Sequence, residues 1–296
     1  MKPPVFDYHR PGTVAEALAV LAELGHQGKV LAGGQSLVPL LNMRLAAPAH
    51  LVDVNRLGEL DEVTSDAGAV RVGALARHAR VEHDREAFAA IPLLRQAIGD
   101  IAHPTIRNRG TVVGSLVHAD PAAELPAVLV LLGGTMELAR AGNGGRRQVA
   151  AADFFVGPLE SALHPGELAT AAVFPRSPAG TGSAWVELAR RHGDYAICGV
   201  GVLITVDQGL RVEAARAACI SVGPVPVPID LTDALGGKPH DAADWAAAGR
   251  LAAAAVDPED DIHATAAYRR HLAGVLTTRA TRAAAAHAAQ RAEAAR

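Results

Sequence analysis

Cysteine is scarce in this chain of 296 residues, which has only two, Cys198 and Cys219. An iron–sulfur cluster takes four protein ligands, usually all cysteines, so the chain cannot hold such a cluster by itself. Both cysteines lie in apolar stretches, which favours buried, unreactive thiols. The 13 histidines show no H-x-x-x-H spacing and no cluster with cysteine, so we expect no metal site.

The sequence also lacks long apolar runs and a strong net charge. Its N-terminus carries prolines and charges where a secretory signal would be apolar, and its longest apolar stretch, near 125–132, is too short to span a bilayer. The net charge of −3 gives no electrostatic reason to expect a nucleic-acid partner. We therefore expect a cytoplasmic protein without a transmembrane segment. Because 50% of its residues are hydrophobic, we also expect a substantial core.

Neither of two familiar nucleotide-binding fingerprints is present. No G-x-G-x-x-G follows a predicted strand and no G-x-x-x-x-G-K-[ST] loop occurs, which disfavours a nicotinamide-type Rossmann domain and a P-loop enzyme. Two other glycine-containing turns, 32–36 (AGGQS) and 111–115 (TVVGS), follow or lie within apolar stretches. Consecutive N–H groups in such turns form concave anion sites, so the two turns resemble halves of one phosphate cradle. Each turn could also be a tight connection that needs glycine for steric reasons alone.

The first turn lies between a predicted strand and a predicted helix. An amphipathic helix at 13–25, opened by a capping box and closed by glycine, precedes a short strand at 29–31. After the turn, four leucines between 37 and 45 recur at helical spacing. Ser36 is a candidate N-cap of this second helix, whose N-terminus would face a phosphate.

Six segments together resemble a known family. In chain order they are 30–37, 39–46, 51–55, 101–111 leading into the second turn, 118–127 and 190–197. In sequence and spacing they are similar to the flavin-binding medium subunit of the molybdenum hydroxylases, with aerobic carbon monoxide dehydrogenase as the nearest branch. The resemblance runs from about Phe6 to about Ala280.

Two positions depart from the family pattern. Where relatives usually have a second glycine, this chain has Val113, and a valine tolerates positive φ badly. That position is therefore expected either to have ordinary β dihedrals or to change the approach to the pyrophosphate. The second departure is Glu124, where relatives usually have an aspartate, so the carboxylate reaches one methylene further.

The resemblance implies that FAD is the cofactor, and we see no residue that demands a covalent link. The N–H groups of 32–36 and 111–115 would hold its diphosphate. The hydroxyls of Ser36, Thr111 and Ser115 would add hydrogen bonds. The implied cofactor-binding residues are Val30, Leu31, Ala32, Gly33, Gly34, Gln35, Ser36, Leu37, Ile101, His103, Thr111, Val112, Val113, Gly114, Ser115, Glu124 and Tyr195.

Four of these residues lie far from the two turns or are separated from them in the chain: Ile101, His103, Glu124 and Tyr195. By resemblance, Tyr195 lies beside the isoalloxazine ring and is the candidate catalytic residue; otherwise it is a core tyrosine under the C-terminal sheet. Glu124 would accept a hydrogen bond from an adenosine ribose hydroxyl, unless it is simply an exposed carboxylate. Ile101 and His103 align with positions that touch the cofactor in relatives, although Ile101 could equally serve packing.

The fold class expected is α+β, a PCMH-type FAD-binding fold of two α/β subdomains followed by a C-terminal domain. The FAD-binding domain would span 1–176, with a small lobe at 1–55 and a large lobe at 56–176. A Pro/Gly/Ser cluster at 176–182 marks the boundary. The C-terminal domain, of the carbon monoxide dehydrogenase flavoprotein type, would span 177–282.

The C-terminal domain is expected to contain three strands and several helices. Strand-like segments at 183–189, 200–206 and 212–222 predict a three-stranded antiparallel sheet. The alanine-rich tail at 283–296 favours helix by propensity but offers little apolar bulk. We therefore expect an end helix that is frayed or docked on a partner.

The resemblance makes the chain an oxidoreductase subunit. A substrate would be oxidised at a molybdenum centre on a large subunit, and electrons would pass through the [2Fe–2S] clusters of a small subunit to FAD and then to an external acceptor. The three chains would form a heterotrimer, itself dimerised. Two alternatives stay open: a stand-alone FAD-dependent reductase of the cell-wall enolpyruvyl reductase type, and a non-catalytic nucleotide-binding or assembly protein, which only Val113 favours.

Overall fold

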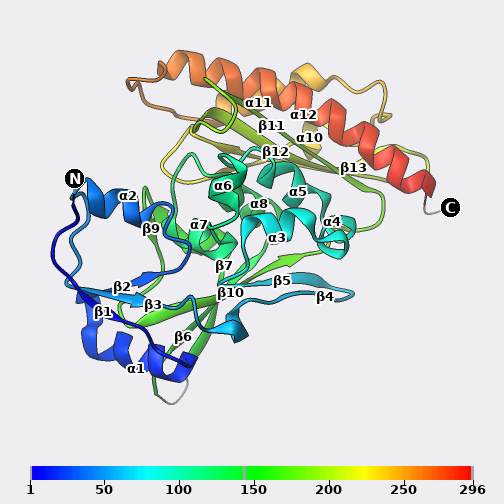
Figure 1. Cartoon of the computed structure of the whole chain (residues 1–296). Helices are drawn as coiled ribbons and strands as arrows, with labels where there is room; N and C mark the ends of the chain where they lie inside the picture. The colour runs from blue at the N-terminus through cyan, green and yellow to red at the C-terminus, as the bar shows by residue number, and fades with distance from the viewer. Residues whose placement is uncertain (1, 143–144, 295–296) are drawn as a thin grey trace.

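The computed structural model of the chain describes residues 2–142 and 145–294. Residues 1, 143 and 144 of the predicted 1–176 domain, and 295 and 296 of the predicted 283–296 tail, lie outside the described residues. The described part has an α+β architecture with three main sheets, one after another along the chain (Figure 1). The division into domains at 176–177 stays a prediction.

The first sheet belongs to the small lobe and is wholly parallel, in the order β1-β3-β2. The elements are β1 (Asp7–His9), α1 (Val14–Leu24), the 3₁₀ turn η1 (Gly25–Gln27), β2 (Gly28–Leu31), α2 (Leu37–Asn42) and β3 (His50–Asp53). Helix α1 begins as predicted, because Thr13 Oγ1 accepts a hydrogen bond from Glu16 N at 3.2 Å. It ends at Gly25, whose φ is +53°.

Helix α2 is shorter than the leucine spacing predicted. It ends at Asn42, and Arg44 then takes a φ of +59°, which no helix accommodates. Of the four leucines, only Leu41 is fully buried, whereas Leu45 is 72% exposed. The spacing misled because the chain turns away from the lobe before Leu45.

The second sheet is five-stranded, with the order β4-β5-β10-β6-β7 and antiparallel pairing throughout. Its strands are β4 (Val63–Ser65), β5 (Ala69–Gly73), β6 (Thr135–Arg140), β7 (Arg146–Ala150) and β10 (Glu167–Pro175). The helices and turns of this lobe are η2 (Gly58–Leu60), α3 (His78–His83), α4 (Arg85–Ala90), α5 (Pro92–Ile98), α6 (Pro104–Arg107), α7 (Val112–His118), α8 (Glu124–Leu132) and α9 (Ala151–Phe154). A small hairpin pairs β8 (Phe155–Gly157) with β9 (Glu160–Ser161).

The third sheet has one strand more than predicted. All three expected strands are present, as β11 (Thr181–Ala189), β12 (Ala196–Val206) and β13 (Val212–Ile220), and a short β14 (Val227–Asp230) joins the edge. The sequence hid β14 because Pro226 directly precedes it and Pro228 lies within it, and proline in a sheet is found at edge strands, strand starts and bulges. The helices that follow are α10 (Thr232–Leu235), α11 (Trp245–Ala255) and α12 (Ala266–Ala294).

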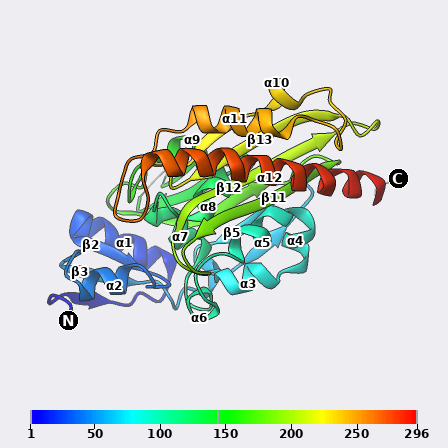
Figure 2. The same cartoon turned by 90° about the horizontal axis from the view of Figure 1, so that it is seen from above.

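The expectation of a frayed end helix is wrong for residues 283–294, whereas docking of this helix on a partner stays a prediction. These residues continue α12, which lies along the third sheet of its own chain (Figure 2). Ala284 and Ala288 are fully buried, and a Cβ added to Gly182 of β11 would lie 2.1 Å from Ala288 N. Small side chains thus let the helix approach the strand closely, and burial here does not need apolar bulk.

The two faces of the third sheet pack in two different hydrophobic cores. Val202 and Ile204 of β12 pack in the core with α11 and α12, whereas Leu203 packs in the core of the lobes. Gly199 and Gly201 leave room for the indole of Trp185, since a Cβ at either would lie 3.0–3.2 Å from its ring. The third sheet is therefore packed against the large lobe, and the loop after β11 is held at that junction.

Candidate cofactor site

The two glycine-containing segments of the sequence lie against each other. A Cβ added to Gly33 would lie 2.5 Å from the carbonyl oxygen of Arg109 and 2.8 Å from Cα of Gly110. Gly34, next in the chain, has a φ of +73°, which glycine adopts without strain. The first loop, residues 32–36, thus needs both glycines for its own shape and for contact with the second segment.

Backbone N–H groups of the first loop have no partner. Among the residues that the structure describes, the N–H groups of Gly33, Gly34, Gln35 and Ser36 donate to no protein acceptor. The Gln35 side chain instead donates to Gly33 O at 3.0 Å, which shapes the loop. A row of free, partly exposed N–H groups is the donor set that an anionic group such as a diphosphate requires.

Ser36 does not cap α2, contrary to the expectation. Its backbone is already helical, with φ −98° and ψ −45°, and its side chain makes no capping hydrogen bond. An N-cap residue normally has extended dihedrals. Its hydroxyl is accordingly not used by the helix.

The second segment, 111–115, is the start of a helix and not a glycine turn. Thr111 is the N-cap of α7: its Oγ1 accepts from Gly114 N at 3.1 Å and its carbonyl accepts from Ser115 N at 3.0 Å. Val112 N donates to Ala76 O at 3.1 Å. Of the five N–H groups of residues 111–115, all predicted to bind a diphosphate, those of Val112, Gly114 and Ser115 therefore donate to protein acceptors. Within the described part of the chain, the N–H groups of Thr111 and Val113 remain free.

Val113 fits this helix without strain. It lies in the first turn of α7, has no positive φ, and its side chain is 2% exposed within the main core. The first expected alternative, β dihedrals, is wrong, because Val113 is helical; the second, a changed approach to the pyrophosphate, stays a prediction. Because its side chain points into the core, Val113 does not obstruct the cradle, which removes the one argument for a chain that has lost its cofactor.

Asn55 and Arg77 connect the first loop to Arg109, two residues before the second segment, a role that sequence reasoning missed. Asn55 Nδ2 donates to Ala32 O of the first loop at 2.8 Å, and Arg77 Nη1 donates to Arg109 O at 2.5 Å. The two side chains also meet, since Arg77 Nη2 donates to Asn55 Oδ1 at 2.7 Å. The only signal in the sequence was the position of Asn55 two residues after the end of β3, because Arg77 lies far along the chain.

The C-terminal sheet brings Tyr195 toward the large lobe. In the loop between β11 and β12, Gly193 has a φ of +85°, and a Cβ there would lie 2.7 Å from the His103 ring. Tyr195 is 73% exposed, so the alternative of a core tyrosine is wrong. Reduced hydration and then the carboxyls of Asp120 and Glu124 raise the pKa of its hydroxyl.

Glu124 is buried, so the alternative of an exposed carboxylate is also wrong. It opens α8 and is 8% exposed. Burial first, and then the nearby charge of Glu187, raise its pKa to about 8. Burial also raises the pKa of Glu187 to about 7, although its carboxylate accepts from Trp185 Nε1 at 3.1 Å. At neutral pH Glu124 is therefore mainly protonated and can both donate and accept hydrogen bonds.

The remaining predicted residues flank these segments. Val30 and Leu31 end β2 and Leu37 opens α2, all three partly buried. Ile101 packs into the main core, as its alternative reading allowed, and His103 is exposed at the start of α6. The structure thus joins the first loop to the second segment, and the His103 segment to the loop of Tyr195.

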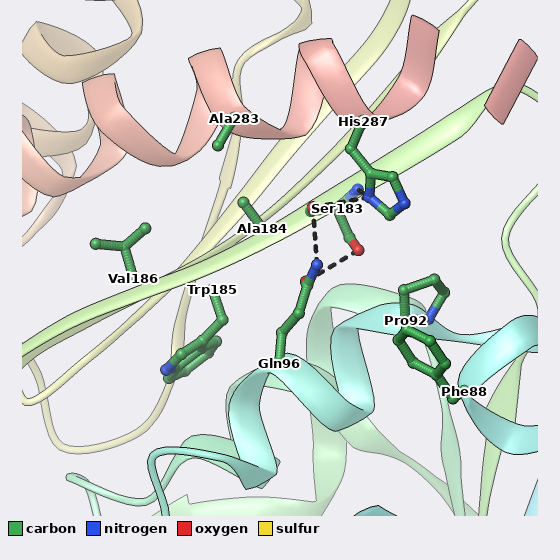
Figure 3. Close-up of a pocket in the computed structure, with 9 residues that line it drawn as sticks. All are labelled: Phe88, Pro92, Gln96, Ser183, Ala184, Trp185, Val186, Ala283 and His287. Carbon is green, nitrogen blue, oxygen red and sulfur yellow. Dashed lines mark hydrogen bonds between the residues drawn. The ribbon is translucent and has the colours of Figure 1, made fainter. Parts of the chain in front are cut away.

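A separate cavity of about 320 Å³ lies between the large lobe and the third sheet (Figure 3). Phe88, Gln96 and Trp185 are among its lining residues, and no predicted cofactor-binding residue is. Ser183 of β11 donates its N–H to His287 Nδ1 at 3.0 Å and its hydroxyl to Gln96 at 3.0 Å. These hydrogen bonds connect β11 to α12 and α5. We therefore interpret the cavity as a gap in the packing between the large lobe and the C-terminal sheet, and not as part of the cofactor site.

The described residues hold no group of three potential metal ligands from histidine, cysteine, aspartate and glutamate. Cys198 and Cys219 are buried as expected, and burial raises the pKa of both thiols. Across residues 2–142 and 145–294, no helix combines the length and apolar character needed to cross a membrane.

Comparison with known proteins identifies two family matches. Residues 4–177 match the FAD binding domain in molybdopterin dehydrogenase, and residues 183–284 match the CO dehydrogenase flavoprotein C-terminal domain. The carbon monoxide dehydrogenase medium chain of Afipia carboxidovorans is 38% identical over 95% of this chain and 96% of its own length. The 6-hydroxypseudooxynicotine dehydrogenase complex subunit alpha of Paenarthrobacter nicotinovorans is 38% identical over 94% of each chain.

Solved structures agree with these matches. The quinoline 2-oxidoreductase of Pseudomonas putida 86 superposes with a TM-score of 0.90 at 37% identity, over 97% of this chain and 99% of the other. The carbon monoxide dehydrogenase of Hydrogenophaga pseudoflava does so with the same TM-score and coverage at 36% identity. The chain therefore belongs to the FAD-binding medium subunits of the molybdenum hydroxylases, oxidoreductases in which this subunit carries the flavin.

Proposed function

We propose that this chain relays electrons from the [2Fe–2S] clusters of a small partner subunit through FAD to an external acceptor. The clusters must lie on another chain, because this one has two cysteines, both buried. A large partner with the molybdenum cofactor completes a heterotrimer, which dimerises and works in the cytoplasm. Relatives named as a medium chain and as a subunit of a dehydrogenase complex support this assembly.

The observation that carries the proposal is the convergence of the two segments. The first loop presents four free N–H groups, and its Gly33 lies against the residues that precede α7. A diphosphate bound by the N–H groups of 33–36 could also reach the N–H groups of Thr111 and Val113. The hydroxyls of Ser36 and Ser115 would add donors, whereas that of Thr111 also caps α7.

Bound FAD supplies the redox chemistry, since it can accept electrons singly and pass them on in ones or twos. The chain's own residues bind and orient it. Tyr195 stands exposed on its loop, where its ring can stack on an aromatic face. Glu124 would hydrogen-bond a ribose hydroxyl, and the contact of Gly193 with the His103 ring supports a role for the His103 segment beside the Tyr195 loop.

We propose that FAD is bound without a covalent link, because the donor groups described above need none. Acid precipitation of the purified protein should leave the yellow cofactor in the supernatant. Flavin retained on the pellet would contradict this part of the proposal.

The relay itself is tested by co-expression with candidate large and small subunits. A cysteine-rich partner should copurify, and its reduced clusters should bleach the flavin absorbance of this chain. The stand-alone reductase alternative makes the opposite prediction: the chain alone would catalyse steady oxidation of a nicotinamide donor, and no partner would copurify.

A further inference from the structure

We infer that Asn55 and Arg77 are positioning residues for FAD, because together they fix the distance between the first loop and the segment that precedes α7. We call this pair the interlobe bridge. The inference rests on the proposed function, in which both segments bind one diphosphate. It assigns a role to two side chains that hydrogen-bond the backbone carbonyl groups of Ala32 and Arg109.

Asn55 is held in one orientation by its neighbours. Asp53 Oδ1 accepts from Asn55 N at 2.9 Å and from Asn55 Nδ2 at 2.7 Å, and Nδ2 also reaches Ala32 O. Because Nδ2 of Asn55 donates to these acceptors, the amide oxygen Oδ1 faces Arg77 and accepts its hydrogen bond. The amide thus offers a donor to Asp53 and Ala32 and an acceptor to Arg77.

Asp53 is itself fixed and charged. Although burial alone would favour the neutral form, hydrogen bonds from Tyr8 and Asn55 outweigh it and lower the pKa of Asp53. An ionised Asp53 accepts both N–H bonds of Asn55. The amide that reaches the first loop is therefore anchored on β3 and not free to rotate.

Arg77 supplies the other half of the bridge. It stands just before α3, in extended conformation, and donates through two different nitrogens, Nη2 to Asn55 and Nη1 to Arg109 O. A planar guanidinium can bond two acceptors at once, which an ammonium group cannot do with the same geometry. The bridge thus runs from Ala32 in the small lobe to Arg109 in the large lobe.

A diphosphate that contacts both segments pays an entropic cost if the segments move independently. Holding them at a set separation before binding lowers that cost and raises affinity. Removing the bridge should therefore weaken FAD binding more than it weakens the fold, since Asn55 and Arg77 lie at the surface or half-buried and fill no core.

The test compares Arg77→Gln and Asn55→Leu with a matched control, Arg80→Gln. Arg80 lies one turn away on α3 and donates to Asp61 O at 2.6 Å and Asp61 Oδ1 at 2.8 Å, with no contact to either segment. FAD affinity is measured by flavin fluorescence during titration of the full chain stripped of cofactor, and folding by circular dichroism and urea unfolding. Each bridge variant should bind FAD about tenfold or more weakly and release it faster, whereas the control should change affinity less than about twofold.

Two further variants separate positioning from a general structural role. Arg77→Lys keeps the charge and one donor group, so it should recover part of the affinity lost in Arg77→Gln. In the double variant Asn55→Leu/Arg77→Gln, the second change should cost little, because the first has already broken the bridge. Unchanged FAD affinity in folded single variants, or fully additive losses in the double variant, would overturn the inference.

Failure of this inference can be told from failure of the proposed site. An acidic substitution at Ser36 tests the first loop alone and leaves Asn55 and Arg77 in place. If that substitution weakens FAD binding while the bridge variants do not, the loop assignment stands and the bridge is wrong. If it leaves FAD binding unchanged, the loop assignment itself is wrong.

Discussion

Gly33 of the small lobe and Arg109 of the large lobe meet backbone to backbone, with only 2.5 Å between a Cβ placed on Gly33 and the Arg109 carbonyl oxygen. Glycine is therefore required at this point whether or not a ligand binds. A bulky residue at Gly33 would push the two segments apart, and the resulting loss of FAD would not distinguish a ligand contact from a packing defect. Gly114 has the same ambiguity, because a Cβ there would lie 2.5 Å from Thr111 Oγ1.

Tyr195 offers a cleaner test of the ring site, because it is exposed. Tyr195→Ala should change the free energy of unfolding by less than about 0.5 kcal/mol, as surface substitutions do. It should, however, shift the flavin absorbance bands and slow electron delivery to an acceptor in the assembled complex. Absorbance spectra and stopped-flow reduction measure both effects.

Tyr268 on α12 is the matched control, since it is also an exposed tyrosine. Tyr268→Ala should alter neither the spectrum nor the rate. If Tyr195→Ala keeps the wild-type flavin spectrum, Tyr195 does not lie at the ring.

Glu124 should make the cofactor-free chain less stable as pH rises. Its folded-state pKa of about 8 exceeds the ordinary 4.5, so between about pH 4.5 and pH 8 the folded state holds more protons than the unfolded state. Stability from this group is fully present below pH 4.5 and is lost as pH rises through 8. Glu124→Gln, which stays neutral, should be more stable than wild type at pH 8.5 by at least about 1.4 kcal/mol, the equivalent of one pKa unit.

Urea unfolding at about pH 4 and at pH 8.5 measures this difference, which should nearly vanish at the lower pH. The slope left in Glu124→Gln is assigned to the other groups with shifted pKa values, Glu187 and Asp100 raised and His78 and His118 lowered by burial. Glu213→Gln, at an exposed site on β13, should leave the pH profile unchanged. Parallel profiles for wild type and Glu124→Gln would contradict the assignment.

The alanine face of α12 should not tolerate larger side chains. Ala288 is fully buried and lies against Gly182, so Ala288→Leu should overpack the contact and cost about 1–3 kcal/mol. Ala286→Leu, on the exposed face of the same helix, should change the urea midpoint little. Equal midpoints for the two variants would show that the helix does not pack as described.

The local parts of the fold could be predicted from the sequence, and the non-local parts could not. The capped helix α1, strand β2 and the first loop follow from neighbouring residues, and so do the three long strands of the C-terminal sheet. The second segment was misjudged because Gly114 suggested a turn, whereas Thr111 had the capping chemistry of a helix start. The contacts between Asn55 and Arg77 depend on two lobes meeting, which no local pattern encodes.

Burial was the other quantity that the sequence left open. The alternative for Tyr195 was a core tyrosine and that for Glu124 an exposed carboxylate, whereas in the structure Tyr195 is exposed and Glu124 is buried. The alanine-rich end of α12 was undervalued because its partners, Gly182 and its neighbours on β11, lie about a hundred residues earlier in the chain. In each case the burial of the residue depends on which distant part of the chain packs against it.

The most direct test of the account is FAD binding by Ser36→Asp and Ser36→Asn. Both side chains are the same size, and an aspartate at this end of α2 favours the helix, so a loss of binding in Ser36→Asp cannot be attributed to unfolding. If the free N–H groups of 33–36 hold the diphosphate, the added negative charge should weaken FAD binding about a hundredfold relative to Ser36→Asn, and less so at high salt. Dissociation constants for the two variants that agree within about threefold would show that the diphosphate does not lie on this loop.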